Sequence, residues 1–167
     1  MTPKALRTAH LDLEPLSRRD RAFVLGLLQD RDVRRYLGGP VMGAAAAVVM
    51  DRYLAPAGET AVWRVARDGD PVGLVFLGPH AETAGAEVSY QFAPKVWGAG
   101  VAFEAVSEVL RWAQDPCGAP CAVAETQAAN LRSLGLLRRL GFTEARRFHR
   151  FGAEQVLVIR PLGPRGT

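Results

Sequence analysis

The stretch Trp97-Gly98-Ala99-Gly100-Val101-Ala102 joins a strand-like segment to a strongly amphipathic one. The segment before it, Ala86 to Ala93, is rich in strand-forming residues and is closed by Pro94. After the turn, apolar residues recur at the spacing of one helical face: Ala102, Ala105, Val106, Val109, Leu110 and Ala113. This order of strand, glycine turn and helix predicts that unbonded backbone amides and the positive end of a helix dipole face whatever lies above the turn.

Glycines at such a turn let an anion approach the main chain closely, which is typical of a phosphate-binding loop. Two common phosphate loops do not fit this stretch. No Gly-Lys-Ser/Thr follows it, and Phe103 stands where a dinucleotide-binding fingerprint needs a small residue. A tight connection whose glycines serve packing alone is the alternative that these six residues leave open.

A second segment has the pattern of a short helix that begins at Asn130-Leu131-Arg132-Ser133 and ends at Leu140-Gly141-Phe142. With the central turn, the opening Leu6-Arg7-Thr8 and the stretch 35–40, it resembles the GNAT family of acetyl-CoA-dependent N-acetyltransferases. Within that family the sequence is most similar to the Rim-type branch, which modifies ribosomal-protein N-termini and small amines. The turn matches the family pattern Gln/Arg-x-x-Gly-x-Gly/Ala, with Trp97 in the first place.

The length of 167 residues predicts a single domain over residues 1–167, with 161–167 as a frayed tail. Strands are expected at 61–67 and 71–77, followed by the strand that begins at Glu87, in an antiparallel meander. The strand expected at 119–126 follows a helix and should therefore run parallel to a neighbour. The predicted fold class is α/β: a mixed, mostly antiparallel central sheet with helices on both faces, which is also the GNAT fold that the resemblance implies.

The first part of the chain predicts a strand over Leu6 to Leu16 and then three helices. These are expected through Phe23 to Leu28, in a short segment that ends at Leu37, and from about Met42 to Leu54. A last hairpin is expected around Gly152. In the resembled family the early helices form one wall of the acceptor site, so the resemblance makes Tyr36 a candidate acceptor contact.

Composition excludes several classes of protein. An apolar content of 49% and a charged content of 23% are typical of a globular protein, and we expect no signal peptide and no membrane association. Cys117 and Cys121 are expected to be free thiols, which favours a cytoplasmic location, and they make a poor metal site. The net charge of +4 favours anionic partners. A ribosome-facing patch, a contact to coenzyme A phosphates and a solvated basic face remain open, but no aromatic motif supports direct nucleic-acid binding.

The resemblance assigns the co-substrate acetyl-CoA to specific residues. Its pyrophosphate would lie on the backbone of Trp97 to Ala102. In the family, the strand before the turn diverges from its parallel neighbour, and Gln91, Phe92 and Ala93 occupy that position, where main-chain groups would hold the pantetheine arm. The amide of Phe92 is our candidate for polarising the thioester carbonyl. Asn130 would contact the pantetheine and is also well suited to cap its helix.

The proton for the departing thiolate has no obvious donor. Many family members place a tyrosine seven residues after the asparagine, where this chain has Leu137. The resemblance suggests Ser133 as the substitute, since it lies one turn after Asn130 on the same side of the helix. A serine is a weak acid, so solvent or a hydrogen bond that stabilises the thiolate stays open as an alternative.

For the base that deprotonates the amine, we prefer Glu87, which matches an acidic position of the Rim-type pattern. Glu125 at the end of the next strand is the other well-placed carboxylate, and His149 is a weaker candidate. His10 and His80 have no recognisable partners in the sequence.

The predicted function is transfer of an acetyl group from acetyl-CoA to a primary amine by direct attack, with no metal and no covalent enzyme intermediate. The acceptor could be a protein N-terminus, a ribosomal protein included, or a small-molecule amine. A homodimer is common in the resembled family. A non-catalytic acetyl-CoA or acyl-CoA binding module and a ribosome-associated interaction protein are the alternatives.

Overall fold

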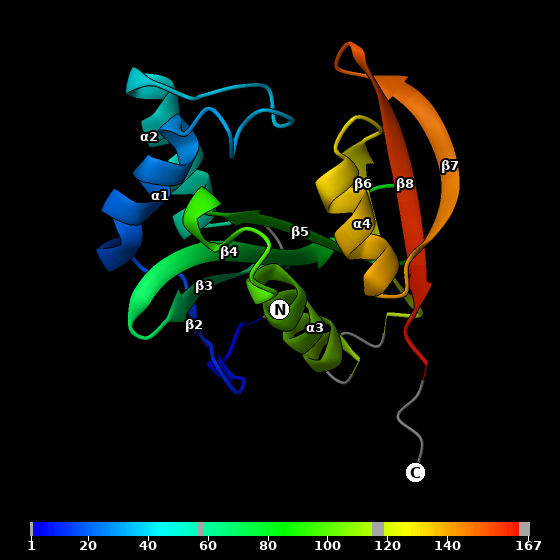
Figure 1. The fold of residues 1–167 in the computed structure, drawn as a ribbon, viewed down its shortest axis with the longest axis horizontal. Coiled ribbons are helices and arrows are strands. Elements are labelled where there is room, and N and C mark those ends of the chain that lie inside the picture. The colour runs from blue at the N-terminus through cyan, green and yellow to red at the C-terminus, as the bar shows by residue number, and fades with distance from the viewer. Residues whose placement is uncertain (1, 57–58, 115–118, 164–167) are drawn as a thin grey trace.

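The computed structural model describes residues 2–56, 59–114 and 119–163. Within these ranges one sheet of eight strands has the spatial order β1-β2-β3-β4-β5-β6-β8-β7 (Figure 1). The strands are β1 (Leu6–Arg7), β2 (Asp12–Pro15), β3 (Ala61–Arg67), β4 (Asp70–Pro79), β5 (Ala86–Phe92), β6 (Cys121–Gln127), β7 (Thr143–Arg150) and β8 (Ala153–Pro161). β5 and β6 run parallel and the other neighbouring pairs are antiparallel. The predicted mixed, mostly antiparallel sheet is confirmed.

Helices cover both faces of this sheet, as predicted. They are α1 (Arg21–Gln29), α2 (Gly43–Leu54), α3 (Val101–Ala113) and α4 (Leu131–Arg139), with short 3₁₀ turns η1 (Arg18–Asp20) and η2 (Pro94–Val96). α1 and α2 enclose a small core with Leu74 of β4, and α3 and α4 pack on the larger core of the opposite face (Figure 1). Successive side chains of β5 therefore alternate between an α1/α2 face, with Gln91, and an α3/α4 face, with Tyr90 and Phe92.

Two expectations for the first 40 residues are wrong, and side chains that bond to the backbone explain both. The strand expected over Leu6 to Leu16 is a hairpin of β1 and β2, because Thr8 turns the chain by accepting the Leu11 N–H at 2.9 Å. The short helix expected to end at Leu37 is a series of turns. The Asp30 carboxylate accepts the N–H groups of the residues two and three positions ahead, as a helix N-cap does. No helix follows, because the Arg34 side chain bonds to carbonyls further along the chain and Gly38 turns the backbone at a φ of +85°.

The C-terminal hairpin of β7 and β8 is longer than predicted and turns at Phe151 and Gly152, both at positive φ. Pro161 ends β8, and Leu162 is buried with its N–H bonded to the Pro120 carbonyl, so the expected frayed tail does not begin at 161. Residues 164–167, and Cys117 of the expected free thiols, lie outside the described residues.

The parallel pair β5–β6 is unusually short. Only Ala86↔Ala122 and Glu87↔Val123 are paired, whereas β5 pairs with β4 over its whole length. From Val88 onward β5 and β6 therefore diverge, and the backbone of β5 lacks a strand partner on the β6 side. This divergence sets the position of the site.

Candidate active site

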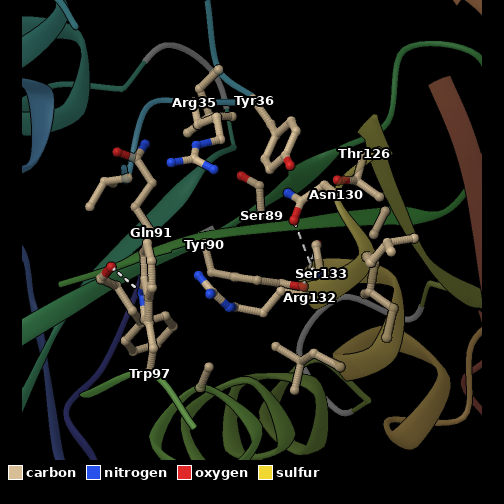
Figure 2. Close-up of a pocket in the computed structure, with 18 of the residues that line it drawn as sticks. Arg35, Tyr36, Ser89, Tyr90, Gln91, Trp97, Thr126, Asn130, Arg132 and Ser133 are labelled. Carbon is tan, nitrogen blue, oxygen red and sulfur yellow. Dashed lines mark hydrogen bonds between the residues drawn. The ribbon is translucent and has the colours of Figure 1, made fainter. Parts of the chain in front are cut away.

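A pocket of about 540 Å³ opens where β5 and β6 diverge (Figure 2). Five parts of the chain form its walls: residues 88–92 of β5, the turn around Gly98 and Gly100, residues 124–126 of β6, residues 129–139 around α4, and residues 32–37 of the turn segment after α1. Residues far apart in the sequence thus meet at one place.

The glycine turn has the backbone conformation that its sequence predicts. Gly98 and Gly100 have φ of +77° and +79°, in the left-handed region that favours glycine, and Gly100 is the N-cap of α3. The first helical bond runs from the Glu104 N–H to the Gly100 carbonyl, so the preceding amides have no partner within the helix. Added methyl groups at either glycine would meet no atom within 4 Å, which shows that the space above the turn is open.

The residues predicted for this turn do not all face the pocket. Trp97, Gly98, Gly100 and Ala102 line it, whereas Ala99 and Val101 do not. Trp97 also ties the turn to β5, because its indole N–H donates to the Phe92 carbonyl at 2.8 Å.

Two arginines of α4 also line the pocket, and one of them, Arg139, belongs to the late basic residues for which the sequence left a contact to coenzyme A phosphates open. The guanidinium of Arg132 lies 3.8 Å from the centre of the Trp97 ring, and that of Arg139 lies 5.8 Å from the centre of Phe103. Both cations are therefore held near the turn by aromatic faces. Their positions on the helical surface after Asn130 could have suggested them, since guanidinium groups suit phosphates.

The register of β5 fixes where the Phe92 amide points. The Ala93 N–H donates to the Val72 carbonyl on the β4 side at 2.9 Å. Because amides alternate sides along an antiparallel strand, the Phe92 N–H points the other way, into the gap beside β6. The Phe92 ring packs on Gly73, and any side chain at position 73 would collide with that ring. Gln91 and Phe92 line the pocket, and Ala93 does not.

Asn130 and Ser133 lie together at the start of α4. The Asn130 side chain caps the helix by accepting the Ser133 N–H at 3.2 Å (Figure 2). The Ser133 hydroxyl lies 2.8 Å from the hydroxyl of Tyr90, which reaches it across the opening from β5. Burial raises the pKa of Tyr90 to about 12, and the bond to Ser133 opposes that rise. Tyr90 was not selected from the sequence, where only its place in the strand before the turn marks it. Leu137 is buried against the same pocket.

The two candidate carboxylates differ in exposure to the pocket. Glu125 lines it and Glu87 does not. Burial is the main cause that raises the pKa of Glu87, the charge of Glu125 raises it further, and His80 and Arg150 oppose the rise. His149 is exposed on β7, outside the pocket lining.

Both histidines that were expected to lack partners have them, so that expectation is wrong. His80 Nε2 lies 3.3 Å from Glu125 Oε1, and His10 Nδ1 lies 3.2 Å from Glu104 Oε2. The sequence hid these contacts because the partners lie 45 and 94 residues away.

Polar groups on the α1/α2 side form the remaining wall (Figure 2). Tyr36 lines it, as expected of an acceptor contact, and its carbonyl accepts the side-chain amide of Gln127 at 3.3 Å. The Gln91 amide nitrogen donates to the Tyr53 hydroxyl at 2.8 Å, while its buried oxygen has no hydrogen-bond partner. One end of a buried amide is thus unsatisfied beside the pocket.

Neither a metal centre nor a membrane span is found in the part of the chain that the structure describes. No three His, Cys, Asp or Glu residues there are grouped so that they could hold a metal ion. None of the helices there combines the length and the apolar character needed to cross a bilayer.

Comparison with known proteins identifies the family. The family model for the acetyltransferase (GNAT) domain matches residues 10–143, and the chain therefore belongs to the GNAT acetyltransferase family. The chain is 27% identical over 164 residues to FsC-acetyl coenzyme A-N(2)-transacetylase of Aspergillus fumigatus, covering 89% of this chain and 70% of that protein.

Solved structures share the fold. An acetyltransferase of the GNAT family from Bacillus anthracis matches with a TM-score of 0.82 at 16% identity, and the match covers 95% of this chain and 99% of that protein's chain. Spermidine N-acetyltransferase from Vibrio cholerae, in complex with CoA and spermine, has a TM-score of 0.78 at 18% identity, with coverage of 93% and 97%. These likenesses establish the GNAT fold.

Proposed function

We propose that this protein is an N-acetyltransferase that moves an acetyl group from acetyl-CoA to a primary amine by direct attack on the thioester. The observation that carries the proposal is the divergence of β5 from β6, with the Phe92 N–H pointing into the gap beside an open glycine turn. The names of the relatives support the same chemistry, since one is a transacetylase that uses acetyl coenzyme A and another was solved with CoA.

The residues present suit acetyl-CoA. Within the turn 97–102, the Trp97 and Ala99 amides already donate to backbone carbonyls, so the other amides would bind the pyrophosphate. Arg132 and Arg139 add positive charge at the same end of the pocket. The pantetheine arm would lie along β5 at residues 91–93, beside Asn130. The Phe92 N–H would donate to the thioester carbonyl, whose oxygen gains negative charge as the amine attacks.

We assign the stabilisation of the departing thiolate to the Tyr90–Ser133 pair. Tyr90 orients the Ser133 hydroxyl, which would donate a hydrogen bond to the sulfur. Because the pKa of Tyr90 is raised to about 12, its hydroxyl stays protonated at neutral pH. The pair therefore stabilises the thiolate, and the proton itself comes from solvent.

Glu87 is the proposed base, and it acts through water. It projects from the same face of β5 as Ser89, which lines the pocket and lies two residues, or about 7 Å, further along the strand. A carboxylate with a raised pKa is better matched to proton transfer near neutral pH than an ordinary glutamate.

The acceptor that we propose is a protein N-terminus or a small-molecule amine, as the Rim-type resemblance suggests, and a ribosomal protein is one such acceptor. A homodimer and a cytoplasmic location stay predictions. For the alternative of a ribosome-associated protein, the basic strand β7 is the relevant surface. Its arginines 146, 147 and 150 each pair with a carboxylate, which reduces the charge available to a ribosome.

The test is incubation with acetyl-CoA and a panel of polyamines, amino acids, aminoglycosides and peptides, with thiol release and product mass as readouts. We expect one added acetyl group on at least one free amine and none on the matching blocked amine. Binding of CoA without turnover on the whole panel would favour a non-catalytic binding module, and acetyl-CoA-independent, salt-sensitive sedimentation with ribosomes would favour the interaction protein.

A further inference from the structure

His80 is a buried histidine to which the proposed reaction assigns no role. It follows β4 directly, its side chain is only 4% exposed, and it lies against Glu125 in the wall of the pocket. Because this buried imidazole contacts a carboxylate of the pocket, it is placed to act on the pocket through that carboxylate.

The hydrogen bonds around His80 define its tautomer. Nδ1 accepts the Glu82 N–H at 3.3 Å and lies 3.1 Å from the Thr83 hydroxyl. The Thr83 oxygen in turn accepts the Gly85 N–H at 3.1 Å, which leaves the hydroxyl hydrogen for Nδ1. With two donors directed at Nδ1, the ring hydrogen is placed on Nε2, where it donates to Glu125 Oε1 at 3.3 Å. Nε2 of His80 is therefore the donor in its contact with Glu125.

Glu125 is held from both sides. His80 bonds one carboxylate oxygen, and the guanidinium of Arg150 on β7 bonds the other. The Glu125 side chain is 11% exposed, and the residue lines the pocket. Three separate elements, the end of β4, β6 and β7, thus fix one carboxylate at the pocket wall.

The charges of this cluster favour a cation. Glu82, Glu87 and Glu125 supply three carboxylates, and Arg146 and Arg150 supply two guanidinium groups. With all carboxylates ionised, one negative charge is left over. A protonated amine that enters the pocket would balance it.

We propose that His80 is a positioning residue, whose Nε2–H holds the Glu125 carboxylate in the pocket wall so that this carboxylate binds the ammonium form of the acceptor. The inference rests on the proposed function and gives it a preference for aliphatic amines, which are cations at neutral pH, over amines that are uncharged there. If His80 only linked β4 to β6, its loss would weaken the binding of every ligand equally through loss of folded protein. If it positions Glu125, its loss weakens the binding of the acceptor alone.

The test compares His80→Leu, which removes the donor, with His80→Gln, which keeps an N–H. His10→Leu, which removes the other histidine–glutamate contact, to Glu104 outside this pocket lining, is the matched control. The acceptors are spermidine, a peptide with a free N-terminus, and an aromatic amine that is uncharged at neutral pH. KM for each is measured at saturating acetyl-CoA, with the Kd of CoA measured separately.

We expect His80→Leu to raise KM for the aliphatic acceptors about tenfold or more, as loss of a hydrogen bond to a charged group should. The Kd of CoA and the KM of the aromatic amine should stay within about twofold, and His80→Gln should recover most of the loss. An unchanged KM for the aliphatic acceptors, or an equal loss for CoA, overturns the positioning role while wild-type turnover upholds the proposed function. Absence of wild-type turnover overturns both.

A pH profile gives a second readout that does not depend on the folding of His80→Leu. The groups that face Glu87 are His80, Glu125 and Arg150, and the charge of Glu125 raises the pKa of Glu87. Glu125→Gln should therefore move the acidic limb of kcat/KM to lower pH and raise KM for the aliphatic acceptors. If the limb moves while KM does not, Glu125 does not bind the ammonium and the proposal fails.

Discussion

The glycine turn offers the sharpest test of the anion site. Gly98 and Gly100 have φ of +77° and +79°, and a methyl group at either would meet no atom within 4 Å. Alanine at these positions therefore brings backbone strain without a collision, at about 1–2 kcal/mol for each left-handed residue. For a chain of this size, each kcal/mol lost from the free energy of unfolding lowers Tm by about 2–4 °C. The double variant should therefore unfold at a lower temperature than wild type but still be folded at 25 °C.

The effect on ligand binding should be much larger than the effect on folding. Both glycines line the pocket, so their added methyl groups would stand where a diphosphate approaches the amides. Loss of a hydrogen bond to a charged group costs about 1.5–3 kcal/mol, or roughly tenfold to a hundredfold in Kd. We expect the double variant to bind CoA about a hundredfold or more weakly, measured by isothermal titration calorimetry.

Gly152 provides the matched control. It also has a positive φ, +72°, and open space around its Cα, but it lies in the β7–β8 turn, away from the pocket lining. Gly152→Ala should lower Tm by about half as much as the double variant and leave the Kd of CoA unchanged. If the Gly98/Gly100 double variant binds CoA as tightly as Gly152→Ala, the turn does not bind the diphosphate and the reasoning fails.

Three further variants test the rest of the site. Gln91→Leu removes a buried oxygen without a partner, which should stabilise the fold by about 1 kcal/mol after loss of the bond to Tyr53; a lower Tm would contradict the unsatisfied amide. Tyr90→Phe and Ser133→Ala should each lower kcat about tenfold or more with the Kd of CoA unchanged, and an unchanged kcat in both would remove the pair from the mechanism. Because burial raises the pKa of Glu87, ionising it costs folding free energy above the raised pKa and nothing below the unfolded value. Glu87→Gln should therefore raise Tm relative to wild type at about pH 8 and make no difference at about pH 4, and a gain that persists in acid would refute this assignment.

Local patterns predicted the elements that depend on neighbours in sequence. Strand β3 has the predicted bounds 61–67, α3 begins at the residue after Gly100, and Gly141 has a positive φ just after α4. The resemblance predicted the divergence of β5 from β6, which local periodicity could not, since strand pairing is a property of the whole sheet.

The features of the site that the sequence analysis did not predict are contacts between residues far apart in the sequence. Tyr90 meets Ser133 across 43 residues, and His80 meets Glu125 across 45. Each contact depends on the order and register of the strands, so no spacing within one segment indicates it. The turn segment after Asp30 was mistaken for a helix because it begins with an N-cap bond, but the Arg34 side chain and Gly38 at positive φ then turn the chain.

The short β5–β6 ladder also affects how the two parts of the sheet move together. Strands β1 to β5 and strands β6 to β8 share only two residue pairs in the sheet, and the core beneath α3 and α4 also joins them. A ligand lodged in the gap would bridge them, and its binding energy would add to the resistance of the whole molecule to unfolding. Amide hydrogen exchange over residues 88–92 should then slow on ligand addition, which would make co-substrate loading a measure of how firmly the two parts are joined.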